Sequence, residues 1–151
     1  MKRRVRSGDP DNIEAPAARR YWPLLLGDDF RRDREAAGIN GLLNYGYTIL
    51  RTLLARSVVA AGLHPSIGIH HANRSNTFAL ADDLVEPFRP LVDAMTLQLV
   101  ARGRRDVTSE AKRAFAGLIA LDLPGANGTT TVTVTAARLA QSKGLTRERR
   151  E

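Results

Sequence analysis

Cysteine is absent from the 151 residues of this chain. This absence excludes disulfides, thiolate metal ligands, thiol nucleophiles and iron–sulfur clusters. A metal ion bound by this chain must therefore be held by carboxylate and imidazole side chains. Long apolar runs are also missing, since no stretch approaches the roughly 20 residues that cross a bilayer. The basic start over residues 1–8 has no apolar stretch behind it, so we expect a cytoplasmic protein without a membrane partner.

Acidic residues are outnumbered, with 16 Asp and Glu against 23 Lys and Arg and a formal net charge of +7. An excess of this size favours an anionic partner, and nucleic acid is the first candidate. Solvated basic faces are the alternative, and charge alone leaves both open. The 43% hydrophobic and 26% charged residues are close to ordinary globular usage, so the chain can build a core. Its length fits a single domain over residues 1–151.

Glycine and proline divide the chain into stretches that are mostly helical in pattern, which predicts an all-α fold. Asp11 or Asn12 can cap the first helix, with Pro16 in its first turn, where a missing N–H does no harm. Glu14 then lies at the start of this helix. The predicted helices cover residues 17–26, 42–61, 91–100 and 110–121.

Local signals refine these boundaries. Gly62 suits the end of the second helix. Thr77 can cap a further helix, in which Pro87 and Pro90 predict a kink or a break before residue 91. Thr108 can cap the helix over 110–121.

The end of the chain gives mixed signals. Residues 124–128 predict a turn. Thr and Val alternate over 129–135, which favours a strand, whereas residues 136–142 favour a helix. The pattern does not decide between the two, and the charged residues 147–151 are expected to fray.

Two carboxylates in the segment FALADDLVEPFRP are candidates for metal binding. Asp83 and Glu86 are three positions apart, so a helix presents both on one face. Leu80, Leu84 and Phe88 form an apolar stripe on the same helix, which places the acidic pair near the edge of a core. Acidic pairs are also common on solvated helix faces, so a metal site and a solvated face both fit this pattern.

A pair of histidines, His70 and His71, stands in the polar loop that leads into this helix. Such a pair is often a surface or hydrogen-bonded feature. An imidazole from the loop, a carboxylate from the following helix and Glu14 from another helix could also converge on one ion. That oxygen-rich ligand set suits Mg²⁺ or Mn²⁺ better than zinc.

Four long motifs follow one another along the chain: IEAPAARRYW at 13–22, LLNYGYTILR at 42–51, LHPSIGIHHANRSN at 63–76 and FALADDLVEPFRP at 78–90. Together they resemble one known family, the CRISPR-associated endonuclease and integrase of spacer acquisition. The resemblance covers roughly Val5 to Arg102, and ordered long motifs are far more specific than a single one. The form GIHH followed by DDLVEPFRP looks most like the type II branch, subtype II-C.

The resemblance implies roles for particular residues. The family's metal-binding catalytic positions fall on Glu14, His71 and Glu86, with Mg²⁺ or Mn²⁺ as the cofactor. Asp83 matches a supporting acidic position, and His70 is implied as the neighbour that sets the tautomer or the loop structure. An exchange of roles between the two histidines stays open. The implied chemistry is attack on a phosphodiester, with water for cleavage or a DNA 3′-OH for strand transfer.

The resemblance also implies an architecture and partners. The family has an α-helical catalytic domain preceded by a β-rich domain that forms the homodimer. This sequence begins only a few residues before Glu14, so we expect a fragment or a truncated gene product that lacks the β-rich domain. The implied partners are double-stranded DNA, as prespacer and CRISPR repeat, and a small subunit that bridges two integrase dimers. Homodimer formation by this chain stays open.

Basic and aromatic side chains have both functional and structural explanations. Arginines could contact phosphate, although ordinary solvation or salt bridges explain each one equally well. Aromatic rings could stack on bases, but at helical spacing they are more often core residues. The arginine candidates are Arg19, Arg20, Arg74 and Arg89. The aromatic candidates are Tyr21, Trp22, Tyr45 and Tyr47.

Two alternatives to an active enzyme follow from the sequence. The chain could be a basic helical DNA-binding module that has lost catalysis. It could also be a structural fragment whose exposed apolar surface causes irregular self-association.

Overall fold

The computed structural model describes residues 14–66, 76–125 and 128–148. Helices dominate this part of the chain, together with one two-stranded antiparallel sheet. The all-α prediction is therefore confirmed. The elements are α1 (Glu14–Leu26), α2 (Ile39–Ala60), α3 (Ala79–Val85), the 3₁₀ turn η1 (Glu86–Phe88), α4 (Arg89–Ala101), α5 (Ser109–Gly117), the 3₁₀ turn η2 (Leu118–Ala120), β1 (Asp122–Gly125), β2 (Gly128–Thr131) and α6 (Val132–Glu148). None of the described helices is both long enough and apolar enough to cross a bilayer.

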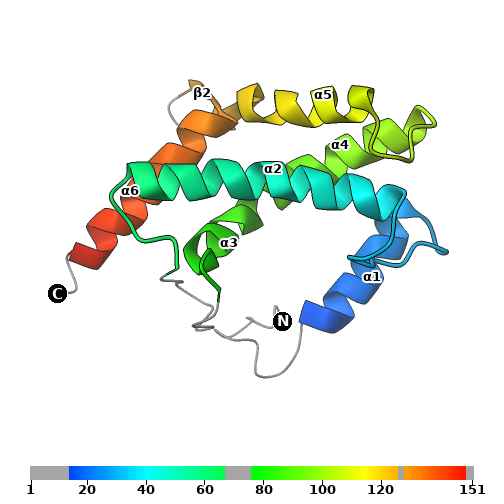
Figure 1. Ribbon diagram of the computed structural model, residues 1–151, viewed down its shortest axis with the longest axis horizontal. Coiled ribbons are helices and arrows are strands. Elements are labelled where there is room, and N and C mark those ends of the chain that lie inside the picture. The colour runs from blue at the N-terminus through cyan, green and yellow to red at the C-terminus, as the bar shows by residue number, and fades with distance from the viewer. Residues whose placement is uncertain (1–13, 67–75, 126–127, 149–151) are drawn as a thin grey trace.

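The long helix α2 lies at the centre of the fold. Figure 1 shows α2 crossing the middle of the molecule, with α5 above it and α1 and α3 below it. Helices α3, α4, α5 and α6 all contact α2. Its apolar residues recur at helical spacing, so one broad face is buried against these neighbours. The buried residues of this face include Leu42, Leu43, Gly46, Leu50, Leu54 and Val58.

Gly46 marks the point where α2 comes closest to its neighbours. A Cβ atom built there would lie 2.6 Å from Cγ1 of Val92 on α4 and 2.7 Å from Cε1 of Phe115 on α5. Real Cβ atoms do not approach other heavy atoms so closely, because protein cores are already close-packed. The missing side chain therefore lets three helices meet at one place.

The predicted interruption before residue 91 is confirmed. Helix α3 ends at Val85, the chain tightens into the 3₁₀ turn η1, and α4 begins at Arg89. Pro87 and Pro90 each lie at the start of their element, where proline is tolerated because the first N–H groups of a helix have no partner within it. The break therefore covers Glu86–Phe88, and Glu86 is its first residue.

The capping predictions are partly right. The Thr108 hydroxyl accepts a hydrogen bond from the backbone N–H of Ala111 at 3.2 Å, which confirms it as the cap of α5. Gly62 has φ of 75° just after α2, as a glycine at a helix end should. The predicted caps Asp11 and Asn12 lie outside the described residues.

The predicted cap at Thr77 is wrong. The N-cap position of α3 is Phe78, and its side chain makes no cap hydrogen bond. The Oδ1 atom of Asn76 instead accepts a hydrogen bond from the backbone N–H of Phe78 at 3.0 Å. An Asn side chain turns back onto its own backbone two residues later in this way, which explains why the structure uses the residue before the threonine.

The ambiguous segment after residue 128 contains both a strand and a helix. Thr129–Thr131 belong to β2, which pairs with β1, and α6 begins at Val132. Every fourth residue of the new helix, at Val132, Ala136 and Ala140, is fully buried, which is the spacing of a helix face. Pro124 lies within β1 rather than in the predicted turn, and residues 126–127 lie outside the described part.

Candidate metal and nucleic-acid site

The predicted metal ligands differ in how far the structure describes them. Glu86 is the first residue of η1, and its side chain is 57% exposed. Glu14 is the first residue of α1, although its side chain lies outside the described atoms. His70 and His71 fall in 67–75, also outside the described residues. Of the predicted triad, only Glu86 therefore has a side chain that can be placed.

The Glu86 carboxylate contacts a residue that was predicted to bind phosphate. Nη1 of Arg89 donates to both carboxylate oxygens of Glu86, at 3.0 Å and 3.2 Å. The guanidinium of Arg89 also lies over the ring of Tyr47, 5.1 Å from its centroid. Burial lowers the pKa of Arg89, but Glu86 and Tyr47 outweigh it and raise the pKa overall. Arg89 is thus a fixed cation beside a predicted metal ligand.

A buried carboxylate, Asp93, joins three helices next to this pair. Its side chain belongs to α4 and is 5% exposed. One oxygen accepts a hydrogen bond from the hydroxyl of Tyr21 on α1 at 2.5 Å, and the other accepts from the hydroxyl of Tyr47 on α2. Both oxygens of a buried charge are therefore satisfied, as its desolvation requires. Asp93 is not among the predicted site residues, although a single acid within the apolar run LVDAMTLQLV is a recognisable signal.

The two tyrosines act as donors over the whole physiological pH range. Burial, followed by the hydrogen bond to Asp93, raises the pKa of Tyr21 to about 12. The same causes raise the pKa of Tyr47 still further. The hydroxyl groups stay protonated at neutral pH because ionisation would place a phenolate against the Asp93 carboxylate.

The loop after α1 is held to α2 by Arg32. Its Nη1 atom donates to Oδ1 of Asn40 at 3.0 Å, and its Nη2 atom donates to Oδ1 of Asn44 at 2.6 Å. Its guanidinium also lies 5.9 Å from the Trp22 ring centroid and 6.0 Å from that of Tyr47. Burial is the main cause that lowers the pKa of Arg32.

Three of the four aromatic residues that could have stacked on DNA bases pack against the hydrophobic core. Trp22 lies 6.0 Å from Phe30, and Tyr45 lies 6.0 Å from Phe115, measured between ring centroids. Trp22, Tyr45 and Tyr47 are partly buried against the hydrophobic core. The structural explanation of these rings therefore holds, while Tyr21 is 41% exposed and bonded to Asp93.

A second ion pair uses Asp82, the neighbour of the predicted Asp83. Nε of Arg51 on α2 lies 2.5 Å from Oδ1 of Asp82, and Nδ2 of Asn76 donates to Oδ2 at 2.7 Å. Burial raises the pKa of Asp82, but the hydrogen bonds from Arg51 and Asn76 lower it overall. Asp83 is partly buried on the same helix. Two adjacent acids look alike in a sequence, and the position of Arg51 on α2 identifies Asp82 as its partner.

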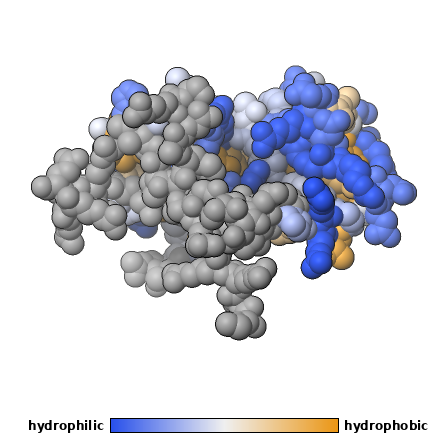
Figure 2. All heavy atoms as spheres, turned by 90° about the horizontal axis from the view of Figure 1, so that it is seen from below, coloured by the Kyte–Doolittle hydropathy of each residue, from blue (hydrophilic) through white to orange (hydrophobic). Residues whose placement is uncertain are grey.

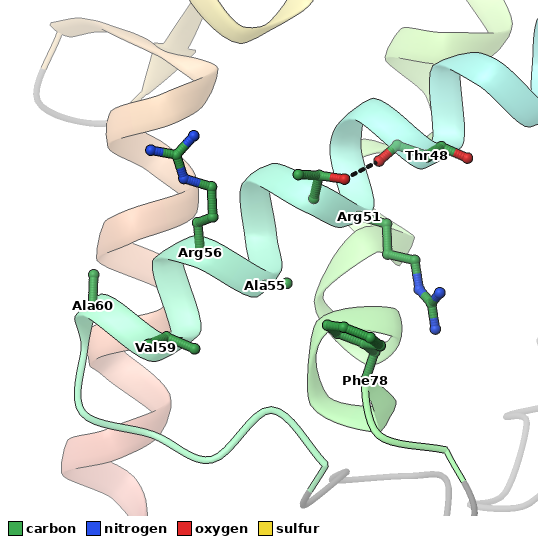
Figure 3. A pocket seen from close by; sticks show the side chains of 8 residues that line it. Thr48, Arg51, Ala55, Arg56, Val59, Ala60 and Phe78 are labelled. Atoms are coloured by element: carbon green, nitrogen blue, oxygen red, sulfur yellow. Dashed lines mark hydrogen bonds between the residues drawn. The ribbon is translucent and has the colours of Figure 1, made fainter.

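An open groove of about 640 Å³ runs along α2 beside this ion pair. Figure 3 shows Arg51 directed toward Phe78, and the guanidinium lies 4.8 Å from the ring centroid. The groove is lined by Thr48, Arg51, Thr52, Ala55, Arg56, Val59, Ala60 and Phe78. Among the described residues that line the groove there is no carboxylate and no imidazole.

The predicted phosphate contacts on α1 are accessible. Arg19 and Arg20 are exposed, whereas Arg74 lies outside the described residues. Figure 2 shows hydrophilic residues gathered on the right-hand side of the view, where α1 and the loop after it lie. The side chains of Arg19 and Arg20 are therefore accessible to phosphate groups. Arg89 could contact a phosphate group only while it lies next to the Glu86 carboxylate.

No three His, Cys, Asp or Glu side chains gather to hold an ion within 14–66, 76–125 and 128–148. His71 and the side chain of Glu14 are not among the described atoms, so the ligand set Glu14, His71 and Glu86 stays a prediction.

Known relatives match the region that carries these residues. Residues 11–115 match the family described as CRISPR associated protein Cas1. A CRISPR-associated endonuclease Cas1 of Neisseria meningitidis serogroup C is 44% identical over 100 residues, which cover 66% of this chain and 33% of that protein. A CRISPR-associated endonuclease Cas1 of Pyrobaculum aerophilum is 40% identical over 89 residues, which cover 57% of this chain and 30% of the relative. The chain therefore spans about a third of the length of these curated relatives.

The fold has a solved counterpart. A casposase bound to integration product superposes with a TM-score of 0.75 at 21% sequence identity, over 91% of this chain and 49% of the casposase chain. At this identity the likeness shows a shared fold. Because the family match covers more than half of the sequence and includes Glu14, the histidine pair and Glu86, this chain belongs to the CRISPR associated protein Cas1 family.

Proposed function

We propose that this chain forms the helical catalytic part of a DNA endonuclease and integrase that inserts new spacers into a CRISPR array. The carrying observation is the family match over residues 11–115, which includes Glu14, His71 and Glu86. Several relatives are named as CRISPR-associated endonucleases. The motifs GIHH and DDLVEPFRP further support the type II branch, subtype II-C.

The proposed cofactor is Mg²⁺ or Mn²⁺, held by Glu14, His71 and Glu86. Two carboxylates and one imidazole form an oxygen-rich set that suits these ions, and the chain has no cysteine to favour zinc or iron–sulfur chemistry. The exposed carboxylate of Glu86 fits this role, because an ion can reach it from solvent. Asp82 fits it less well, since Arg51 and Asn76 already occupy its oxygens.

The residues around Glu86 would prepare the site for a phosphodiester. When bound, the ion would polarise the scissile phosphate and stabilise charge on the attacking or leaving oxygen. Arg89 supplies a positive charge beside Glu86 and can exchange part of that contact for a phosphate oxygen. Arg19 and Arg20 on α1 would hold the flanking DNA backbone. Asp83 and His70 are proposed to support the ligands rather than to react.

The proposed partners come from the family. The substrates are double-stranded prespacer DNA and the CRISPR repeat, and a small adaptation subunit bridges two integrase dimers. A homodimer is part of the same proposal, since two-ended integration requires two active sites at a fixed spacing.

One observation favours a second candidate, a helical DNA-binding module with impaired catalysis. The carboxylate of Glu86 is already neutralised by Arg89, and a metal ion has to compete with this contact. If the contact persists in solution, the basic chain would bind DNA without cleaving it.

Cleavage of branched DNA separates the two candidates. The chain is incubated with labelled branched duplexes while Mn²⁺ is titrated, beside Glu86→Ala and a matched control, Glu110→Ala. Glu110 is also an exposed glutamate paired with an arginine, since Nε of Arg104 lies 2.8 Å from its Oε2 atom. If the chain is the proposed endonuclease, cleavage should depend on Mn²⁺, be abolished in Glu86→Ala and be retained in Glu110→Ala. Binding of the same DNA with no Mn²⁺-dependent cleavage supports the second candidate.

A further inference from the structure

The hydrogen bond between Tyr21 and Asp93 connects α1, which carries the proposed ligand Glu14, to α4, which directly follows the turn η1 that carries the proposed ligand Glu86. Tyr21 lies on α1, which begins at Glu14, and Asp93 lies on α4, which follows η1 and Glu86. The hydroxyl of Tyr21 reaches Oδ2 of Asp93 at 2.5 Å across 72 positions of sequence. The contact therefore joins distant parts of the chain directly, and we call this hydrogen bond between Tyr21 and Asp93 the tie.

Sequence spacing places this tie on the same faces as the proposed ligands. Tyr21 follows Glu14 by seven positions within α1, nearly two full turns, so the two positions lie on one face of the helix. On the other side, Glu86 and Arg89 are three positions apart across η1, and Asp93 follows Arg89 by four within α4. These are the spacings of neighbours on one face of a 3₁₀ and of an α-helix. The contact between Arg89 and Glu86 agrees with this placement.

The tie is rigid at the Asp93 end. Asp93 is 5% exposed, and its second oxygen is occupied by the hydroxyl of Tyr47 on α2. The ring of Tyr47 in turn supports the guanidinium of Arg89, 5.1 Å from its centroid. Tyr21 therefore binds to an acceptor that is fixed by the central helix, and the same central helix supports the cation beside Glu86.

We infer that Tyr21 and Asp93 are positioning residues of the proposed metal site. Their hydrogen bond sets where the face of α1 that carries Glu14 lies relative to the face of η1 and α4 that carries Glu86. A metal site needs its ligands held within a fraction of an ångström, so partners outside the ligand shell influence affinity. The inference rests on the proposed function, because it takes Glu14 and Glu86 as ligands of one ion.

Mn²⁺ affinity provides the first test, measured on the full chain from the electron paramagnetic resonance signal of free Mn²⁺. Tyr21→Phe removes one hydroxyl and keeps the ring. We expect it to weaken Mn²⁺ binding roughly tenfold, the usual effect of losing an outer-shell partner. The matched control is Tyr45→Phe, the same change in a tyrosine that packs on Phe115. We expect that control to bind Mn²⁺ like the unmodified chain.

A double-mutant cycle shows whether Tyr21 acts through Glu14. We expect Glu14→Gln to weaken Mn²⁺ binding, and the added Tyr21→Phe to weaken it no further, because displacing a ligand that has already been removed has no further effect. An equal loss from Tyr21→Phe in both backgrounds overturns the inference, since it indicates a general structural role. Unchanged binding in Tyr21→Phe beside weakened binding in Glu14→Gln overturns the inference and leaves the proposed function intact. Unchanged binding in Glu14→Gln overturns both.

Hydrogen exchange provides a readout that needs no metal. Loss of the tie should let α1 open more readily, so its backbone amides should exchange faster in Tyr21→Phe than in Tyr45→Phe. The amides of α2 should be unchanged in both variants. Equal protection of α1 in the two variants overturns the inference, whatever the outcome of the Mn²⁺ titration.

Discussion

Arg89 donates from a single nitrogen to both carboxylate oxygens of Glu86, at 3.0 Å and 3.2 Å. The contact joins the first residue of α4 to the first residue of η1, on either side of the break set by Pro87. The guanidinium is held in place by the ring of Tyr47. A cation therefore lies beside the proposed metal ligand, where it would compete with a metal ion and attract a phosphate.

This relationship predicts opposite effects of Arg89 on two ligands. Arg89→Gln removes a positive charge beside Glu86, and even a solvent-screened repulsion of about 1 kcal/mol corresponds to about a fivefold change in affinity. We expect Arg89→Gln to tighten Mn²⁺ binding about fivefold and to weaken binding of duplex DNA, both measured by titration at low salt. Arg104→Gln is the control, since Arg104 pairs with the exposed Glu110. Weaker Mn²⁺ binding in Arg89→Gln would show that Arg89 helps to orient Glu86 instead of competing with the ion.

The role of the histidine pair can be tested through stability. A ligand that binds only the folded state raises the free energy of unfolding by about 2.7 kcal/mol at 100 times its Kd. We expect Mn²⁺ to raise the thermal midpoint of the chain, and His71→Ala to remove most of that rise. His64→Ala is the control, because the ring of His64 contacts the hydroxyl of Ser66 in the described part of the same loop. A full Mn²⁺ effect in His71→Ala would remove His71 from the ligand set, and testing His70→Ala then shows whether the two histidines exchange roles.

The Arg51–Asp82 pair predicts a pH-dependent contribution to stability. The pKa of Asp82 is lowered in the folded protein, so its contribution is present above the unfolded value of about 4 and is lost as pH falls through the folded value. We expect Arg51→Met to destabilise the chain near pH 7 and to have a smaller effect near pH 3, in urea unfolding. Arg56→Met is the control on the same helix and beside the same groove. A pH-independent loss in Arg51→Met would assign its contribution to packing on Phe78.

Elements with strong local patterns could be predicted from the sequence. The apolar spacing of α2, the prolines around η1 and the cap at Thr108 all act within a few residues, and each agrees with the structure. Thr77 failed because the backbone N–H groups that it would cap, those of Ala79 and Leu80, donate instead to the backbone oxygens of Asn76 and Pro65. The segment after Gly128 stayed undecided because alternating Thr and Val residues fit a strand, while tertiary burial of every fourth residue selects the helix.

The candidate site depends on contacts that a local pattern does not contain. One contact is local: Glu86 and Arg89 were singled out separately, although side chains three positions apart are neighbours on one helix face. The buried Asp93 was missed, because its role needs Tyr21 and Tyr47 from two other helices. Asp82 was not singled out, because its contact with Arg51 of α2 depends on tertiary structure.

The close meeting of helices at Gly46 predicts a contrast between two glycines. A Cβ atom at Gly46 would overlap with Val92 and Phe115, whereas a Cβ atom at Gly117 would meet nothing within 4 Å. Overpacking a core costs about 1–3 kcal/mol, while replacing an exposed helical glycine with alanine gains up to about 1 kcal/mol. We expect Gly46→Ala to lower the free energy of unfolding by about 1–3 kcal/mol. We expect Gly117→Ala to leave the free energy of unfolding unchanged or to raise it. Chemical denaturation of both variants checks this, and equal stability of the two would contradict the packing.

The two exposed arginines of α1 predict where duplex DNA binds. Removing one phosphate contact reduces the slope of log affinity against log salt by about 0.9. If Arg19 and Arg20 both contact phosphate, the double variant Arg19→Gln/Arg20→Gln should reduce that slope by about two and weaken binding at every salt concentration. The matched control, Arg102→Gln/Arg113→Gln, removes two exposed charges at the end of α4 and on α5, so the net charge of the two variants is the same. A nonspecific effect of net charge would lower affinity equally in both, whereas a defined DNA path along α1 lowers it only in the first. Fluorescence anisotropy measures the affinity for duplex DNA over a series of salt concentrations. It therefore decides whether DNA binds along α1 toward Glu14 or binds the basic chain without a preferred face.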